Sequence, residues 1–208
     1  CPKTMPPETS AINANTVKEL REKTGCGMMD CKKVLVETDG DMERATELLR
    51  KKGLASAAKR GGKQTANGMV ESYIHLNGRI GVIVELNCET DFVARNPEFA
   101  ALARDIAMQV AASNPQYVTR EEVPENVINS EKEILKSVAL SEGKPEKIID
   151  KMVEGRIEKY YAEVCLLDQP FIKELSKKVE DLIKEHIAKF GENIQISRFT
   201  RYQVGEKS

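Results

Sequence analysis

The sequence has no tryptophan and only two histidines, His75 and His186, among its 208 residues. Its five cysteines, at positions 1, 26, 31, 88 and 165, are odd in number and form no Cys-x-x-Cys pair. That spacing disfavours a disulfide framework and a zinc site, whose ligands usually lie close together in sequence. We therefore expect free thiols in a reducing compartment, no metal site and no bound cofactor.

Several functional motifs are also missing. No Gly-x-x-x-x-Gly-Lys-Ser/Thr phosphate loop occurs, so the chain is not expected to hydrolyse GTP. No combination of acid, base and nucleophile is recognisable, which argues against an enzyme. No apolar run approaches the roughly 20 residues that a membrane-spanning helix needs. With 32 Lys and Arg against 33 Asp and Glu, the net charge of −1 gives no general attraction to nucleic acid.

The first quarter of the chain predicts a small helical domain. Residues 1–12 contain three prolines and little periodicity, which is typical of a flexible tail. A helical pattern then occurs three times over residues 13–54, and Gly53 suits the position that directly follows a helix. We predict a three-helix domain over 13–54, followed by a flexible linker over residues 55–66.

The remaining chain, residues 67–208, mixes strand and helix patterns and predicts an α+β core domain. Two alternating runs with Asn77-Gly78 between them indicate a β-hairpin. Two narrow apolar stripes over about 125–164 indicate an antiparallel helical hairpin of the coiled-coil type. Further helices are expected at about 97–112 and 176–189, and a strand at about 193–204 completes a three-stranded antiparallel sheet.

The register of the β-hairpin has two solutions. A two-residue loop, which Asn77-Gly78 favours, places Leu76 opposite Arg79 and His75 opposite Ile80. A three-residue loop instead places the apolar side chains of both strands on one face. We predict the three-residue loop, which leaves Tyr73 and His75 on the outer face of the sheet.

An acidic and aromatic turn follows the second strand of this hairpin. Two conformations are open to Phe92 within it. The ring either folds back onto the core of its own chain, as most Phe side chains do, or projects with Asp91 as a wedge for a partner. Asp91 favours the wedge, because an unpaired carboxylate is costly to bury. The stretch around the turn reads Glu85-Leu86-Asn87-Cys88-Glu89-Thr90-Asp91-Phe92-Val93-Ala94-Arg95.

A second stretch with a distinctive composition lies in the helical domain. Met28 and Met29 are adjacent on a predicted helix and therefore point about 100° apart, so at least one is expected to be partly exposed. An exposed methionine is a soft contact surface for a partner. This stretch reads Leu20-Arg21-Glu22-Lys23-Thr24-Gly25-Cys26-Gly27-Met28-Met29-Asp30-Cys31-Lys32-Lys33-Val34-Leu35.

Both stretches resemble signatures of the elongation factor Ts family, the nucleotide exchange factors of the GTPase elongation factor Tu. The resemblance extends from about Ala11 to the end of the chain. It implies that the first domain is similar to ubiquitin-associated domains. The chain has one sheet-bearing core where longer family members have two, so the resemblance further implies a homodimer. It implies no direct contact with nucleic acid or membrane.

The resemblance also implies two sets of functional residues. One set disturbs the Mg²⁺ ion held by elongation factor Tu, namely Asp91, Phe92, Val93 and Ala94. The other set binds the partner, namely Lys18, Met28, Met29 and His75. The alternative function is a structural or ribosome-associated interaction module without exchange activity. We expect a bacterial cytoplasmic location or, alternatively, a plastid or mitochondrial matrix after removal of a transit peptide.

Overall fold

A computed structural model describes residues 12–206, which form two compact units. The helical unit consists of the chain up to Lys63 together with Lys184–Asn193. The sheet unit consists of Gln64–Ile183 together with the chain from Ile194 onwards. The predicted tail, residues 1–12, lies outside the described residues apart from Ile12.

The helical unit is built around three helices, α1 (Ala14–Thr24), α2 (Met28–Glu37) and α3 (Met42–Arg60). The side chain of Asp41 caps α3 by accepting hydrogen bonds of 3.0 Å from two backbone N–H groups of its first turn. The apolar periodicity of the three sequences directs one stripe of each helix inward. Their shared core contains Val17, Leu20, Cys31, Val34, Leu35, Ala45 and Leu49.

The predicted end of the third helix at Gly53 is wrong. Helix α3 continues to Arg60, so residues 55–60 of the predicted linker are helical. A Cβ atom at position 53 would lie 3.1 Å from the Cβ of Ala188 on helix α8 (Val179–Phe190). Gly53 therefore allows α3 and α8 to approach closely, which is a packing role and not a stop signal.

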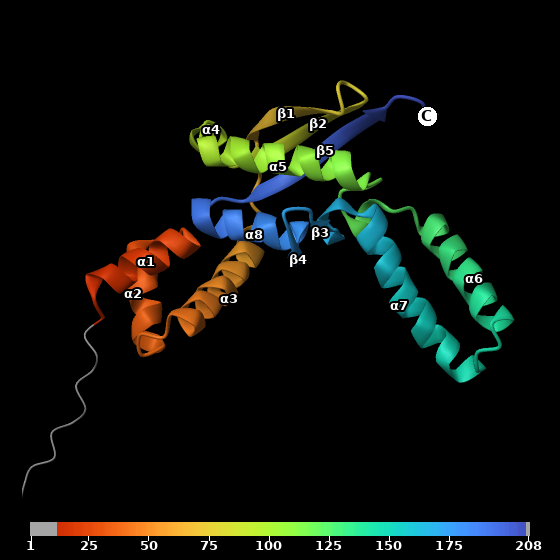
Figure 1. Ribbon diagram of the computed structural model, residues 1–208, viewed down its shortest axis with the longest axis horizontal. Helices are drawn as coiled ribbons and strands as arrows, with labels where there is room; N and C mark the ends of the chain where they lie inside the picture. Colours follow the sequence, from red (N-terminus) through yellow and green to blue (C-terminus); the bar gives the residue numbers. More distant parts are fainter. Residues whose placement is uncertain (1–11, 207–208) are drawn as a thin grey trace, which may run out of the picture. The chain divides into compact units, whose positions relative to one another are not determined.

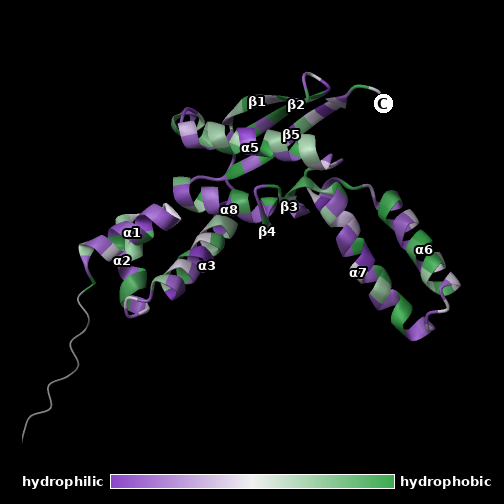
Figure 2. Ribbon diagram, in the orientation of Figure 1, coloured by the Kyte–Doolittle hydropathy of each residue, from purple (hydrophilic) through white to green (hydrophobic). Residues whose placement is uncertain are grey.

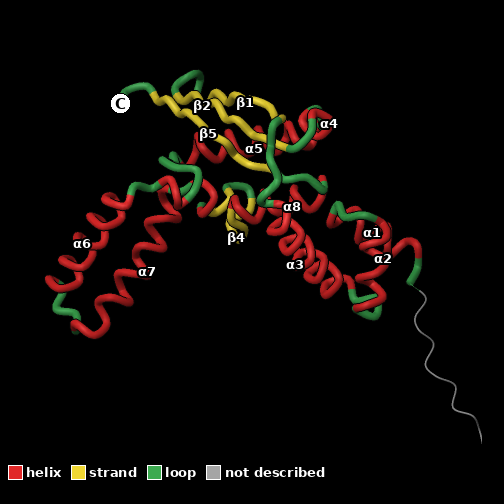
Figure 3. The backbone as a smooth tube through the Cα atoms, turned by 180° about the vertical axis from the view of Figure 1, so that it is seen from behind, coloured by secondary structure: helices red, strands yellow, loops and turns green. Residues whose placement is uncertain are grey.

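The sheet unit contains the predicted three-stranded antiparallel sheet, and the α+β class is confirmed. Its strands are β1 (Asn67–His75), β2 (Ile80–Cys88) and β5 (Ile194–Gln203), in the order β1-β2-β5. Helix α5 (Pro97–Ser113) lies across one face of this sheet (Figure 1, Figure 3). The buried side chains of β2 and α5 form the centre of the core, namely Val82, Val84, Leu86, Cys88, Phe99, Leu102, Ile106 and Val110.

The predicted three-residue loop is also wrong. His75 pairs with Ile80, so four residues connect the strands and the register is the even one. Leu76, Asn77 and Gly78 all adopt left-handed backbone angles, with φ of 50°, 54° and 88°. The local preference of Asn-Gly for such angles therefore decides the register. Tyr73 and His75 consequently share the face of Val82 and Ile80, which α5 covers, and do not lie on the outer face.

The predicted helical hairpin is formed by α6 (Glu125–Ser141) and α7 (Glu146–Val164). Gly143, with φ of 70°, lies in the turn between them. Hydrophobic and hydrophilic residues alternate along both helices (Figure 2). The helices bury a narrow seam that contains Ala139, Ile149, Val153 and Ile157.

Residues 166–178 contain short elements that the sequence patterns did not predict. A 3₁₀ turn (Leu166–Asp168) leads into a two-stranded ribbon of β3 (Pro170–Phe171) and β4 (Glu174–Lys178). The helix predicted to begin at about Ser176 therefore begins only at Val179, because the preceding residues pair with β3.

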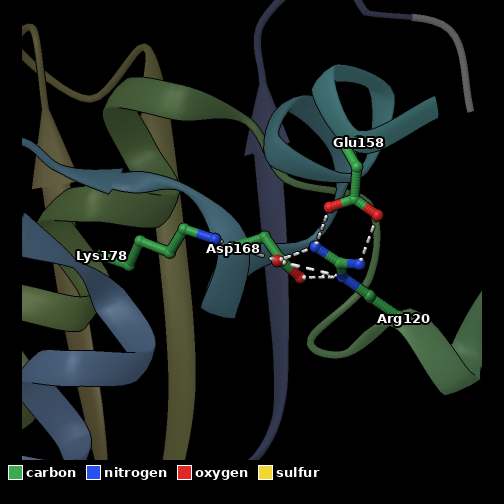
Figure 4. A network of polar contacts seen from close by, with 4 residues as sticks. All are labelled: Arg120, Glu158, Asp168 and Lys178. Carbon is green, nitrogen blue, oxygen red and sulfur yellow. Dashed lines mark hydrogen bonds and ion pairs between the residues drawn. The ribbon is translucent and has the colours of Figure 1, made fainter. Parts of the chain in front are cut away.

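The base of the helical hairpin is fixed by Arg120, in the short 3₁₀ helix Arg120–Glu122 (Figure 4). Its guanidinium donates hydrogen bonds of 2.6–3.0 Å to Asp168 and of 2.8–2.9 Å to Glu158 on α7. It also lies 4.6 Å from the ring centre of Tyr161. Lys178 approaches the same Asp168 carboxylate at 3.7 Å. This network connects α7 to the residues that precede α6 and to the β3–β4 ribbon.

Candidate functional site

The Phe92 turn, which we define as residues 89–96, connects β2 to α5 and contains the short helix α4 (Asp91–Ala94). The side chain of Phe92 is 83% exposed, which excludes the alternative in which it folds onto its own core. A shallow surface depression beside it is lined by Asp91, Phe92, Arg95, Asn96 and Pro97. An exposed phenylalanine in such a position is an apolar group available to a partner.

Both ends of the turn are fixed by caps. The hydroxyl of Thr90 accepts a 3.5 Å hydrogen bond from the backbone N–H of Val93. The amide oxygen of Asn96 accepts a 2.9 Å bond from the N–H of Glu98 and caps α5, whose first residue is Pro97. Between the caps, the Asp91 carboxylate and Arg95 form an exposed ion pair of 3.2 Å.

The four residues implicated around the turn do not share one orientation. Asp91 and Phe92 are exposed, whereas Val93 is buried and Ala94 is half-buried. The prediction that all four residues act directly on the partner therefore does not hold for the buried side chain of Val93. Its side chain packs into the sheet unit, so it anchors the turn and presents no surface.

His75 lies at the opposite end of β1 from the Phe92 turn. Its Nδ1 atom is 2.9 Å from the hydroxyl of Tyr73, and the two rings stack with centres 5.7 Å apart. The guanidinium of Arg104 lies 5.5 Å from the centre of the Tyr73 ring and 3.7 Å from Glu71. Tyr73 and its neighbours thus hold the exposed His75 ring in a defined position.

The structure does not bring His75 and Phe92 together. Asn67 pairs with Cys88 at the end of the sheet that leads into the turn, and His75 pairs with Ile80 at the other end. Eight residue steps along β1 separate the two ends, which corresponds to about 26 Å. Both residues belong to the sheet unit, whereas Lys18, Met28 and Met29 belong to the helical unit.

The helical unit presents an apolar surface on α2. Met28 and Met29 are 52% and 66% exposed, as the prediction for adjacent helical residues required. Val36 is also exposed, and with Met29, Lys32, Lys33 and Glu37 it lines a shallow depression. Val36 was not among the predicted contact residues, although its seven-residue spacing from Met29 places both on one helix face. Lys18, on α1, is exposed and forms a 3.9 Å ion pair with Glu22.

A third apolar surface follows directly from the even hairpin register. We call it the outer sheet face and define it by four side chains that are each more than half exposed, namely Val70, Ile74, Ile83 and Tyr202. They lie on the face of the sheet opposite α5. Ser72, Glu85 and Thr200 lie on the same face between them. Several exposed apolar side chains on the outside of a sheet are typical of an interaction surface.

Two of the buried cysteines, Cys31 and Cys165, have the properties of inert core thiols. Burial raises the pKa of the Cys165 thiol to about 11, and it also raises the pKa of Cys31. Within residues 12–206, no group of three or more His, Cys, Asp or Glu side chains is arranged to hold a metal ion. No helix in this part of the chain is long and apolar enough to cross a membrane.

Comparisons with known proteins point to one family. The model of the family described as "Elongation factor TS" matches residues 42–206. The chain is 66% identical over 195 residues to elongation factor Ts of Syntrophomonas wolfei subsp. wolfei, covering 94% of this chain and 91% of the relative. It is 64% identical to the protein of that name from Desulforamulus reducens, covering 94% and 90%, and 62% identical to that from Moorella thermoacetica, covering 94% and 96%.

Proposed function

This chain belongs to the elongation factor Ts family, and from that membership we propose how it acts. It is a guanine nucleotide exchange factor of translation elongation. It binds elongation factor Tu in complex with GDP and promotes release of the nucleotide, so that GTP can bind. It forms and breaks no covalent bond, and its effect rests on binding alone. The observation that carries the proposal is the exposed Phe92 ring on a turn that is fixed at both ends.

Phe92 is the wedge of this mechanism. Burial of a phenylalanine side chain contributes about 1.5–3 kcal/mol, and in this fold Phe92 can gain that free energy only from a partner. Insertion of the ring, with Asp91 beside it, displaces the groups that hold Mg²⁺ in the GTPase. Loss of the ion removes the main counter-charge of the GDP phosphates. By linkage, the exchange factor and GDP weaken each other's binding by the same factor.

The other exposed residues provide binding without carrying the exchange step. The three helices of the helical unit form a domain similar to ubiquitin-associated domains, and Met28, Met29 and Val36 on α2 grip the GTPase, with Lys18 nearby in sequence. His75, held by Tyr73, makes a second contact from the sheet unit. The coiled-coil hairpin of α6 and α7 adds an accessory contact. The similarity to bacterial relatives supports a cytoplasmic location.

Release of labelled GDP from elongation factor Tu tests this proposal. The chain should accelerate release, and Phe92→Ala should remove most of the acceleration. Leu175→Ala is a matched control, because Leu175 on β4 is another highly exposed apolar residue of the sheet unit. If the unaltered chain binds elongation factor Tu without accelerating release, it is a structural interaction module and not an exchange factor.

The outer sheet face supports a homodimer. A second copy of the chain is the proposed cover for Val70, Ile74, Ile83 and Tyr202, because a dimer with two-fold symmetry places the same surface of both copies together. Light scattering should report about twice the chain mass of 23.2 kDa. Ile83→Lys on the central strand should shift the mass to that of a monomer, and Leu175→Lys should not. A monomeric parent chain at micromolar concentration would contradict the dimer.

A further inference from the structure

Two side chains at the end of the sheet hold the backbone of the Phe92 turn. The Asn67 side-chain amide donates a 2.8 Å hydrogen bond to the carbonyl of Glu89. The Cys88 thiol donates a 3.1 Å bond to the carbonyl of Thr90. Asn67 and Cys88 pair directly across β1 and β2, so their side chains lie on the same face of the sheet. The two bonds therefore hold two consecutive carbonyl groups that immediately precede α4.

Helix α4 needs such anchors because it is only four residues long. An isolated helix of this length is unstable in water, so tertiary contacts must set its orientation. On the core side, Val93 supplies the apolar anchor. On the sheet side, the hydrogen bonds from Asn67 and Cys88 supply the polar anchors. The direction of the Phe92 ring depends on both, because Phe92 lies next to Val93 and two residues after Thr90.

We propose that Asn67 and Cys88 are positioning residues that fix the Phe92 turn for insertion into the partner. That the turn inserts into a partner rests on the proposed function. That Asn67 and Cys88 fix the turn is a property of the isolated chain and can be tested without the partner. A turn held in one orientation loses less conformational entropy on binding than a mobile one. Loss of either hydrogen bond thus lowers the fraction of molecules whose Phe92 is correctly placed.

The absence of tryptophan allows a direct measurement of this positioning. Phe92→Trp introduces a single tryptophan, which can be excited selectively at wavelengths where the five tyrosines do not absorb. Its time-resolved anisotropy reports the mobility of the turn. In that background, Asn67→Asp removes the amide donor at nearly unchanged side-chain volume and places a carboxylate beside the Glu89 carbonyl. It should therefore increase the amplitude of fast depolarisation. Thr65→Val is the control, because it removes a 3.1 Å bond to Gln195 that does not involve the turn. Equal mobility in the Asn67→Asp variant and its parent would overturn the inference.

Cys88 tests the second hydrogen bond independently. Cys88→Ala removes the donor and should mobilise the fluorophore, whereas Cys88→Ser keeps a donor and should restore most of the order. This pair also decides the question if Asn67→Asp fails to fold. Equal mobility in both Cys88 variants would mean that the thiol only fills space.

GDP release then shows whether the positioning serves exchange. Asn67→Asp should slow release about fivefold at subsaturating factor, which is the usual effect of one hydrogen bond. It should slow release no further in a Phe92→Ala background, because residues that act through each other are not additive. If Asn67→Asp slows release equally with Phe92 present and with Phe92→Ala, Asn67 does not act through Phe92, and the positioning role is refuted. If Phe92→Ala alone leaves release unchanged, the proposed wedge fails, and the anisotropy still decides whether Asn67 orders the turn.

Discussion

Phe92 and Val93 are neighbours in one helical turn, yet the Phe92 side chain is 83% exposed and that of Val93 is 5% exposed. One residue is thus available to a partner while the next belongs to the core. Within a single turn of backbone, Phe92 is thus proposed to serve binding and Val93 to serve folding. Substituting each residue in turn tests the proposed mechanism.

We expect opposite results when each of these residues is truncated. Phe92→Ala should leave the melting temperature nearly unchanged and strongly slow GDP release, because the ring has no environment in its own chain to lose. Val93→Ala should destabilise the fold by about 2 kcal/mol, as expected for lost apolar burial and a cavity. Thermal melts and release rates of both variants test this. A strongly lowered melting point for Phe92→Ala, with normal exchange per folded molecule, would sink the wedge.

Arg120 gives a prediction for the base of the helical hairpin. Arg120→Lys should destabilise the sheet unit by about 2 kcal/mol, because an ammonium group cannot make the paired hydrogen bonds to Asp168 and Glu158 at once. Arg156→Lys is the matched control on α7. Its 3.5 Å contact with Glu142 is exposed, so the change should stay within about 0.5 kcal/mol. Urea denaturation of both variants measures the difference, and equal midpoints would contradict a structural role for Arg120.

Two glycines should respond in opposite directions to substitution by alanine. A Cβ atom at Gly68 would overlap the backbone carbonyl oxygen of Leu86, so Gly68→Ala should destabilise the hairpin by about 3 kcal/mol. A Cβ atom at Gly155, inside α7, would meet nothing within 4 Å. Gly155→Ala should therefore stabilise the protein by about 1 kcal/mol through helix propensity. Chemical denaturation tests both signs.

We expect the folded protein to lose stability at high pH because of the buried Cys165 thiol. Burial raises the pKa of this thiol from 9.0 to about 11, so the unfolded chain releases the proton at a lower pH than the folded chain does. A group with a raised folded pKa contributes stability that is complete below the unfolded pKa and declines as the pH rises towards the folded pKa. Stability should therefore fall between about pH 9 and pH 11. Cys165→Ala should make the decline shallower, and an unchanged pH profile would show that Cys165 does not cause it.

The sequence predicted those features that depend on neighbouring residues. Helix capping is local in this sense, because the side chains of Asn13, Asp41 and Asn96 each accept a hydrogen bond from a backbone N–H group two residues later. The helical hairpin and the three-stranded sheet follow from apolar periodicity, which needs no knowledge of the partner element. Exposure of at least one of Met28 and Met29 likewise followed from the angle between adjacent helical residues, and both are exposed.

The incorrect predictions concern contacts between distant residues or competition between two local rules. Gly53 suggested a helix end because its actual neighbour, Ala188, is far away in the sequence. The predicted hairpin register assumed that the apolar side chains of the first strand, such as Val70 and Ile74, are buried. Both are exposed, because the Asn-Gly turn determines the pairing. For Phe92, two conformations were left open, because a turn sequence does not show which side chain faces the core.

The division of the helical unit between two stretches of sequence affects the order in which the protein folds during synthesis. Arg50 of α3 lies 3.8 Å from Glu185 of α8, and Asn193 donates a 2.8 Å hydrogen bond to the carbonyl of Lys63. The ribosome must add the 120 residues from 64 to 183 before these partners exist. At about 5–20 residues per second, α3 waits roughly 6–24 s with this side uncovered. The helical unit is thus the first to enter synthesis, yet it is complete only after all of the sheet unit except the stretch from Ile194 has been made.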